Sequence, residues 1–482
     1  MFDDTKDKGC NNNETLSRRH FLQIALGTTV TLALNPLSNA LAAISPSKPI
    51  ADVNFAVLSD IHYYAPELGT TGSAFETYLA GDRKMLTESH TTLISAIDTV
   101  KKSNAEIVLI CGDLTKDGEL ICHQRVADML SGLTECGKKA LVINGNHDIY
   151  NPNAYSYSGA SQTRVPTIGP DDFKNIYSEF GYRQAIATDP NSLSYVVEPV
   201  DGLRIIAMDS CKYDANNTLP VTSGALPDSR LTWIKNQLRE AGQQGKMIIG
   251  MMHHGIVPHF SAQPDYFPEY ILDDYDEVGR SLSELGLQVV FTGHFHAQNI
   301  SRAIFDNNTL LDIETGSLVT YPIPYRFVRL SPDKNRLAIT SSRVTHTAFS
   351  VAPLDFQRYA KKFTAGNMKE LFIQQLTAII MQLNAGLSQS QAAAMAAKFA
   401  TTPVFFTVTV SDLFVNAMLA HYCGDVDIDG QTQAIYQALA ASEDSVTGQY
   451  QQVLGKFLLS IGTASPLGDN NLIVNCKNGK NW

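Results

Sequence analysis

The chain has 482 residues, more than one hydrophobic core usually serves, so we expect at least two domains. Its hydrophobic content of 44% and charged content of 18% are those of an ordinary globular protein. The net charge of −11 argues against a nucleic-acid polymer as partner, because a non-specific binder needs a basic surface. A small phosphorylated substrate stays possible on charge grounds, because bound metal ions can reverse the local field.

The first 42 residues are typical of a twin-arginine export signal. Arg18 and Arg19 precede an apolar stretch at residues 24–34, and Ala-Leu-Ala at residues 40–42 supplies a cleavage site. The stretch is too short and too rich in Thr for a stable membrane span, and no other run is long enough. We therefore expect a signal peptide at residues 1–42 and a periplasmic or secreted protein. An ordinary secretory signal with an accidental arginine pair is the alternative.

Six cysteines remain after removal of the signal, since Cys10 leaves with it. An oxidising compartment permits disulfides, and Cys423 with Cys476 is the candidate pair. Cys111 lies in a predicted strand, where we expect a small buried residue.

Strand and helix signals alternate between residues 53 and 344, and shorter strands follow Gly293. This pattern predicts an α/β fold, a β-sandwich of mixed sheets flanked by helices. A hairpin signal at Asp201-Gly202 joins two of the strands. The predicted strands are residues 54–58, 106–110, 139–143, 195–199, 203–208, 246–252, 287–292, 299–304, 309–314, 325–330 and 336–342, and the predicted helices include residues 86–102 and 229–241.

Composition changes after Pro353, where Ala, Gln, Leu and Met recur at helical spacing until about residue 462 and a Gly/Asn-rich tail follows. We therefore predict one domain at residues 43–350 and a mainly α-helical C-terminal domain at residues 355–482. These helices would either cap a site or mediate dimerisation, and the oligomeric state stays open.

Candidate metal ligands follow five of the predicted strands. Residues i and i+2 of a strand point to one side. The pair Asp60 and His62 can therefore bind one ion, and the pair His294 and His296 can do the same. Asp113 can bridge two ions through its two oxygens. Carboxylate, amide and imidazole ligands suit Mn, Fe or Zn, so we expect two divalent ions of this kind. The seven candidate ligands are Asp60, His62, Asp113, Asn146, His253, His294 and His296.

These motifs resemble those of the calcineurin-like metallophosphoesterase superfamily, and within it the class III cyclic-nucleotide phosphodiesterases. The resemblance covers residues 53–344. It implies that Asp60, His62, Asp113 and His296 hold one ion, and that Asp113, Asn146, His253 and His294 hold the other. It also implies that His147 is catalytic, contacting the phosphate and assisting the leaving oxygen. The motifs are Ser59-Asp60-Ile61-His62, Gly112-Asp113-Leu114-Thr115 with Asp117-Gly118, Gly145-Asn146-His147-Asp148, Asp209-Ser210 and Thr315-Gly316-Ser317.

Departures from related patterns narrow this resemblance. Lys116 stands where purple acid phosphatases would have a metal-binding Tyr, and Lys116-Asp117 stands where protein Ser/Thr phosphatases would have Asp-Arg. Gly255 replaces the usual proline after the histidine pair. His254 points away from His253 by strand alternation, so we expect a supporting or structural role for it. Asp148 either orients His147 or serves as a turn carboxylate.

The expected function is hydrolysis of phosphodiesters by a metal-bridging hydroxide, with His147 as the acid that serves the leaving group. A phosphomonoesterase of the nucleotidase or acid-phosphatase type is the enzymatic alternative. A degenerate metal-binding or phosphate-binding protein is disfavoured, because every expected ligand is present. Aromatic residues at 149–170 and 255–275 either stack on the substrate or pack their own loops. No role is assigned to His90, His123, His346 or His421.

Overall fold

The computed structural model describes residues 51–331, 336–384, 386–442, 446–463 and 465–475. The predicted signal peptide, Cys10 and Cys476 lie outside these residues, so the signal and the Cys423–Cys476 pair stay predictions.

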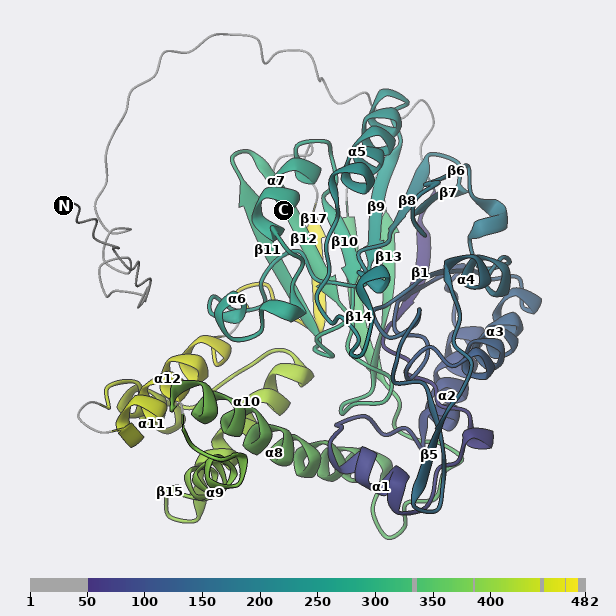
Figure 1. Ribbon diagram of the computed structural model, residues 1–482. Helices are drawn as coiled ribbons and strands as arrows, with labels where there is room; N and C mark the ends of the chain where they lie inside the picture. Colours follow the sequence, from purple (N-terminus) through teal and green to yellow (C-terminus); the bar gives the residue numbers. More distant parts are fainter. Residues whose placement is uncertain (1–50, 332–335, 385, 443–445, 464, 476–482) are drawn as a thin grey trace, which may run out of the picture. The chain divides into compact units, whose positions relative to one another are not determined.

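Two β-sheets pack against each other (Figure 1), and the side chains between them form a hydrophobic core. The rings of Phe55 in the first sheet and Phe291 in the second meet edge-on, with centroids 5.3 Å apart. Strands that are covered on both faces need continuous apolar runs, and Val53–Leu58 and Ile107–Cys111 are such runs. The sandwich predicted from the alternating strand and helix signals is therefore confirmed.

The first sheet has parallel and antiparallel halves that meet at its strand β1. This strand pairs in parallel with β2 and antiparallel with β13. In the described part of the chain the strand order is β17 (Asn471–Asn475), β14 (Arg336–Arg343), β13 (Pro324–Ser331), β1 (Val53–Leu58), β2 (Ile107–Cys111) and β3 (Lys139–Ile143).

The second sheet contains a run of parallel strands, β8, β9, β10 and β12, whose carboxyl ends meet at one edge. The hairpin predicted at Asp201-Gly202 joins β7 to β8, and Gly202 supplies the φ of 90° that the turn requires. Among the described residues the strand order is β11 (Asn299–Phe305), β12 (Asn308–Glu314), β10 (Val289–Thr292), β9 (Met247–Met252), β8 (Leu203–Met208), β7 (Tyr195–Val200) and β6 (Ala187–Thr188).

Helices flank both sheets. α3 packs beside β3, and α2 packs on α3. α5 and α7 bury Ile234, Leu238, Val278 and Leu282 in a second core with strands of the second sheet. The helices of this part are α1 (Ser73–Ala80), α2 (Ser89–Lys102), α3 (Leu120–Glu135), α4 (Pro170–Ile176), α5 (Asp228–Gln243), α6 (Gln263–Tyr266) and α7 (Tyr275–Ser283). A small hairpin is formed by β4 (Tyr155–Ser158) and β5 (Ser161–Arg164).

The C-terminal region is helical, as predicted, and its hydrophobic core also includes Phe260, Phe295 and Ala297 of the preceding part of the chain. The side chains of Asp355, Ser388, Thr409 and Asp429 accept hydrogen bonds from backbone N–H groups in the first turns of four helices. The helices are α8 (Phe356–Leu383), α9 (Gln389–Ala400), α10 (Val410–Cys423), α11 (Gly430–Ala440) and α12 (Val446–Ile461), and β15 (Pro403–Phe405) pairs with β16 (Val408–Thr409).

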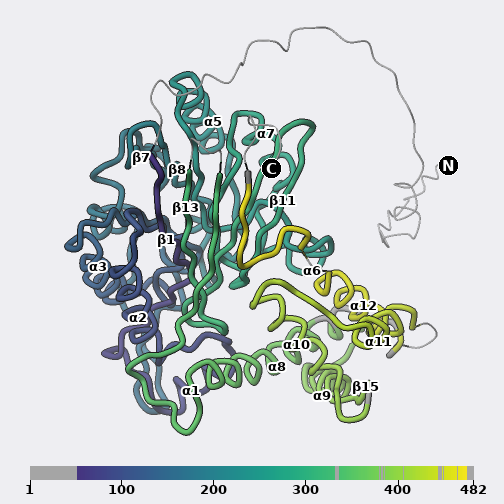
Figure 2. Tube along the Cα trace, turned by 180° about the vertical axis from the view of Figure 1, so that it is seen from behind, coloured from purple at the N-terminus to yellow at the C-terminus, as the bar shows by residue number. Residues whose placement is uncertain are grey.

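After the last helix the chain returns to the first sheet, where β17 lies along β14 (Figure 2). The Gly/Asn-rich composition predicted a tail here and no strand, and only three apolar residues lie between Asn471 and Asn475. Within the described residues, no helix combines the length and apolarity that a bilayer crossing requires.

Candidate dimetal active site

The predicted ligand residues all follow strand ends at one edge of the sandwich. Asp60 and His62 follow β1, Asp113 follows β2 and Asn146 follows β3 soon after its last residue. His253 follows β9, and His294 and His296 follow β10. Because these strands are parallel within each sheet, their carboxyl ends lie together. The structure brings all seven predicted side chains into one buried group.

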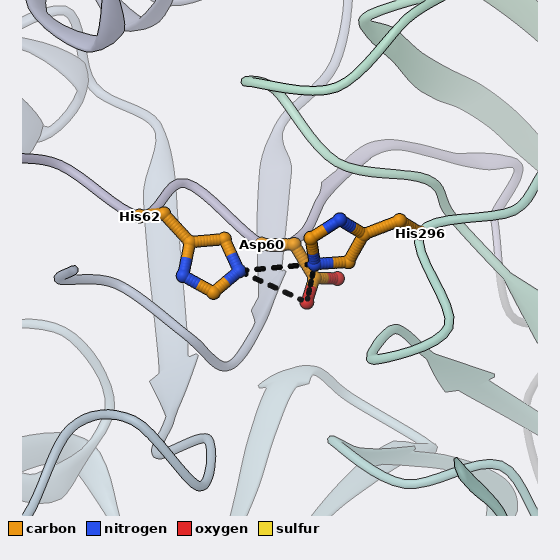
Figure 3. Close-up of side chains that lie close together, drawn as sticks. All are labelled: Asp60, His62 and His296. Carbon is orange, nitrogen blue, oxygen red and sulfur yellow. Dashed lines mark hydrogen bonds and ion pairs between the residues drawn. The ribbon is translucent and has the colours of Figure 1, made fainter. Parts of the chain in front are cut away.

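Asp60, His62 and His296 form the first cluster, and Figure 3 shows their polar atoms pointing toward one another. The Nε2 atoms of the two histidines are 3.0 Å apart. Oδ1 of Asp60 lies 3.4 Å from Nε2 of His296 and 3.8 Å from Nε2 of His62. This buried oxygen has no hydrogen-bond partner, whereas Oδ2 of the same carboxylate accepts from Ser59 and from the backbone N–H of His294. An unpaired buried carboxylate oxygen between two imidazoles fits a cation.

His253 and His294 bring two lone pairs together in the second cluster. Nδ1 of His253 donates to the carbonyl of Cys111 at 2.8 Å, and Nε2 of His294 donates to the carbonyl of Glu269 at 3.0 Å. A carbonyl oxygen only accepts, so in the neutral rings the other nitrogens are acceptors. Those two nitrogens lie 3.1 Å apart, and Oδ1 of Asn146 lies 3.0 Å from the His253 nitrogen. Facing acceptors repel one another unless positive charge lies among them, so this cluster fits a second cation.

Asp113 lies between the clusters. Its Oδ2 is 3.5 Å from Nε2 of His62 and 3.3 Å from Nε2 of His253. Its Oδ1 accepts from the backbone N–H of His147 at 2.9 Å. One oxygen of this carboxylate, Oδ2, thus faces a histidine of each cluster, whereas the sequence predicted that both oxygens would be used.

The electrostatics around Asp113 and His253 favour positive charge, whereas burial lowers the pKa of His62, His294 and His296. Burial lowers the pKa of His253, but Asp113 and Asp60 outweigh burial and raise it to about 10. Burial opposes the charge on Asp113, yet His253, His147 and His62 hold the pKa of this carboxyl well below its usual range. Divalent cations would supply, in place of a proton, the charge that these carboxylates attract.

The backbone of this site departs from the regular strand on which the sequence argument relied. Asp60, His62, Asp113, His294 and His296 have φ values of 49°, 41°, 48°, 83° and 70°. These residues therefore lie in left-handed loops beyond the strand ends, so strand alternation does not apply to them. Asp60 and His62 do lie in one cluster, but the prediction that His294 and His296 bind one ion together is wrong, because His296 lies in the first cluster and His294 in the second. Left-handed backbone at non-glycine residues costs about 1–3 kcal/mol each and is concentrated at functional sites.

His147 lies beside the first cluster, and hydrogen bonds at its Nδ1 atom fix the orientation of its ring. Its Nδ1 is 2.7 Å from the carbonyl of Lys116 and 2.9 Å from Oδ1 of Asp117, so Nδ1 carries a proton. The ring meets that of His62 edge-on with centroids 4.9 Å apart, and 22% of the side chain is exposed. Burial and Lys84 lower the pKa of His147, but Asp113 and Asp117 raise it above the usual value overall.

A family model described as calcineurin-like phosphoesterase matches residues 53–298, which include all seven ligand residues and His147. The match covers more than half of the sequence. The chain belongs to the calcineurin-like phosphoesterase family. It is a metallophosphoesterase, and the family and the residue clusters together fit a dimetal centre.

Two curated relatives carry phosphodiesterase names. Sphingomyelinase phosphodiesterase D of Dictyostelium discoideum is 30% identical over 170 residues, which are 30% of this phosphoesterase and 37% of the relative. A probable cyclic nucleotide phosphodiesterase of Vesicomyosocius okutanii subsp. Calyptogena okutanii (strain HA) is 24% identical over 212 residues, 43% of this chain and 70% of the relative. The chain thus spans little more than a third of the first relative. Among solved structures, a dimetal phosphatase from Danio rerio aligns with a TM-score of 0.43 and 14% identity, covering 62% of this chain and 98% of that one.

Asp148 and His254 have supporting places in the phosphoesterase site. The Asp148 carboxylate accepts from the backbone N–H groups of Leu114, Thr115 and Gly145, so it is a turn carboxylate and does not orient His147. His254 hydrogen-bonds to the Ser210 hydroxyl and the Thr222 carbonyl, and its ring lies 4.3 Å from that of His294. Asp117, which does orient His147, was noted in the sequence only as part of a motif.

The sequence did not reveal two basic side chains at the rim of the site, those of Arg83 and Lys84. They lie in the loop after α1, far from any motif, and no sequence signal marks them. Lys84 is buried and pairs with Asp82 at 3.3 Å. After burial, its charge is the largest influence that lowers the pKa of His62. The rim therefore carries positive charge suited to a phosphate group.

Most of the aromatic side chains in the two candidate loops pack within the protein. Tyr157 is buried against Tyr64, Phe75 and Tyr78. Tyr270 is different, because its ring lies against the ring of His294 with centroids 4.9 Å apart. His123, His421, Phe260 and Phe267 belong to buried packing, and Nε2 of His421 lies 3.2 Å from Nδ1 of His259.

Proposed function

We propose that this phosphoesterase hydrolyses phosphodiesters of small molecules. Two divalent cations would be held by Asp60, His62, Asp113 and His296 on one side, and by Asp113, Asn146, His253 and His294 on the other. The observation that carries the proposal is the pair of facing acceptor clusters that share Asp113.

The chemistry of the reaction divides between the cations and the chain. Two divalent cations, when bound, activate water and neutralise charge on the phosphate. The oxygen of water adds to phosphorus, the ester P–O bond breaks, and the products are a phosphomonoester and an alcohol. His147 holds a proton on Nδ1, so its Nε2 is free to carry a second proton to the departing oxygen.

Two considerations support a diester over a monoester. Both curated relatives have names of phosphodiesterases. The rim carries the buried ammonium group of Lys84 and the partly buried guanidinium of Arg83, and Arg83 lies beside apolar side chains.

The test compares bis-p-nitrophenyl phosphate with p-nitrophenyl phosphate, using protein loaded with Mn²⁺, Zn²⁺ or Fe²⁺. We expect kcat/KM for the diester to exceed that for the monoester by about tenfold or more. The Asp113→Asn variant, which loses the shared carboxylate, serves as the inactive control. A preference for the monoester would replace the proposal by a phosphomonoesterase, and no metal-stimulated hydrolysis of either ester would reject an enzymatic function.

We also propose that the chain is exported by the twin-arginine route and acts in the periplasm or outside the cell. The motif at Arg18 and Arg19 and the small residues at 40–42 support this. Replacement of both arginines by lysine should retain an uncleaved precursor inside a bacterial host. Efficient export of that variant would instead indicate an ordinary secretory signal.

A further inference from the structure

An apolar groove lies among the C-terminal helices and the loop that contains α6. Its cavity volume is about 360 Å³, a size typical of small-molecule sites. Helices α8, α9, α10 and α12 supply its walls, and α6 lies beside α12 in both views (Figures 1 and 2). The groove is lined mainly by Phe372, Leu376, Phe399, Phe414, Leu454 and Phe457.

The groove is not explained by the packing of the helical region. Its wall residues are already buried in the core of that region. A solvent-accessible apolar groove of this size is suited to an apolar ligand group. Val453 at the rim is 49% exposed, so the groove has access from solvent.

The groove continues toward the candidate metal ligands. A smaller cavity of about 40 Å³ shares Phe267, Gln375 and Phe414 with the groove and is lined at its other end by Arg83, Tyr270 and Phe295. The Tyr270 ring lies against the His294 ring, and Phe295 separates His294 from His296 in the chain. Glu269, which lines the groove, accepts the His294 Nε2 hydrogen bond through its carbonyl. Residues that line the groove and the smaller cavity therefore contact His294, one of the candidate metal ligands.

The smaller cavity has one basic side chain in its lining, that of Arg83. Nε of Arg83 is buried and has no hydrogen-bond partner, and the guanidinium lies 5.9 Å from the centre of the Tyr270 ring. A guanidinium binds phosphate oxygens well because its N–H groups match their geometry. Going from the metal ligands toward the groove, one thus meets first the guanidinium of Arg83 and then an apolar surface. That order matches a molecule with an anionic head and a hydrocarbon tail.

We infer that the groove binds the alkyl chain of an amphiphilic phosphodiester substrate, whose phosphate lies at the metal ligands beside Arg83. This inference rests on the proposed phosphodiesterase function and names its substrate class. The occupant is the tail of the substrate itself, because the smaller cavity adjoins the groove and is lined by Tyr270, which contacts the candidate metal ligand His294.

The test is a chain-length series of p-nitrophenyl alkyl phosphates with methyl, butyl and octyl groups, kept below their micelle concentrations. In each case water displaces p-nitrophenolate and leaves the alkyl phosphate. Each fully buried methylene group increases binding affinity about fourfold, and in a half-open groove we expect an increase of about twofold for each methylene. The kcat/KM of the octyl ester should then exceed that of the butyl ester by about 16-fold or more.

Two variants address the groove directly. Leu376→Trp fills it, and Val453→Asp places a charge at its exposed rim, where folding should tolerate the change. Each should lower the octyl-to-butyl ratio to below about threefold. Met395→Trp is the matched control, since Met395 is an exposed residue of α9 that does not line the groove, and it should keep the wild-type ratio.

Calorimetry with octyl phosphate and the metal-free protein gives a second readout. We expect binding by the wild type and by Met395→Trp, and weaker binding by Val453→Asp. Hydrolysis of the methyl ester with no gain for octyl would overturn the inference and leave the proposed function standing. Groove-dependent binding of octyl phosphate without hydrolysis of any ester would support the groove and reject the phosphodiesterase.

Discussion

The Nδ1 atom of His147 lies 2.9 Å from Oδ1 of Asp117, a buried carboxylate that also pairs with the ammonium group of Lys116. The rings of Tyr64, Tyr78 and Tyr157 surround that ammonium group. Because these contacts hold the Asp117 carboxylate in place, that carboxylate fixes the orientation of the His147 ring. The other ring nitrogen, Nε2, is then free to face the substrate.

Asp117→Asn should slow the reaction and shift its pH dependence. Asp117 contributes to raising the pKa of His147, so its neutral replacement lowers that pKa. If protonated His147 is the acid, the alkaline limb of the kcat/KM profile moves to lower pH, and kcat falls about 10–100-fold. The measurements are the pH–rate profile for the diester and the metal content per chain, which should stay near the wild-type value.

Asp128→Asn is the control for this change, because the Asp128 side chain is 73% exposed on α3. It should alter neither the profile nor the rate. A slower Asp117→Asn enzyme with an unshifted profile would mean that Asp117 only supports the fold.

His147→Ala should remove the acid while leaving the metal ligands in place. General acid catalysis contributes about 10²–10⁴-fold, and the loss should be larger for an alkyl than for a p-nitrophenyl leaving group, because p-nitrophenolate needs little protonation. Rates with both leaving groups and elemental analysis check this prediction. His90→Ala, at an exposed histidine, is the matched control. Loss of bound metal in the His147 variant would contradict the assignment.

The sequence was sufficient to predict the two sheets and to identify the residues that come together at the candidate site. Apolar runs such as 139–143 and 203–208 coincide with β3 and β8, because strands buried on both faces tolerate few polar residues. The order of polar motifs behind these strands placed the ligands at one sheet edge.

What sequence could not predict depends on contacts between distant segments. Arg83 reaches the site rim from a loop with no motif, and Asp117 was distinguishable from Asp148 only by the direction of its side chain. The short strand β17 forms because β14 offers it an open edge, not because its own sequence is strongly apolar.

Gly145→Ala should disrupt the shared carboxylate. A Cβ atom at Gly145 would lie 2.1 Å from Oδ1 of Asp113, so that side chain or its loop must move. We expect loss of metal and a fall in kcat/KM of about 100-fold or more, as a displacement of about 1 Å can cause. Gly242→Ala in α5 is the control, since nothing lies within 4 Å of its Cβ position, and it should stabilise slightly. Full activity of Gly145→Ala would show that Asp113 need not hold its position.

Metal binding should raise the thermal stability of the protein. The two clusters of buried acceptors repel one another without a cation, and a cation relieves this repulsion only in the folded state. At an ion concentration about 100 times Kd, each site adds about 2.7 kcal/mol, or about 3–5 °C in Tm. Calorimetric scans with chelator and with Mn²⁺ measure this shift. Asp113→Asn should lose most of it, and an equal shift in that variant would place the metal elsewhere.

Arg326→Met should strongly destabilise the fold. The Arg326 side chain is completely buried and donates to the carbonyl oxygens of Glu314, Asn299 and Asp469, which joins β13 to the second sheet and to the segment before β17. Burial lowers the pKa of Arg326 to about 10, so it remains charged at neutral pH. The apolar replacement leaves these buried carbonyls without donors, and the free energy of unfolding should fall by about 3–5 kcal/mol.

Arg329→Met, three residues along β13, is the matched control for this substitution. Its side chain is 59% exposed and pairs with Asp52 at the surface, so the loss should stay below about 1 kcal/mol. Denaturant unfolding of both variants, followed by circular dichroism, measures the difference. Equal stabilities would mean that the chain satisfies the Glu314, Asn299 and Asp469 carbonyls without Arg326, and that the junction between the sheets does not depend on this residue.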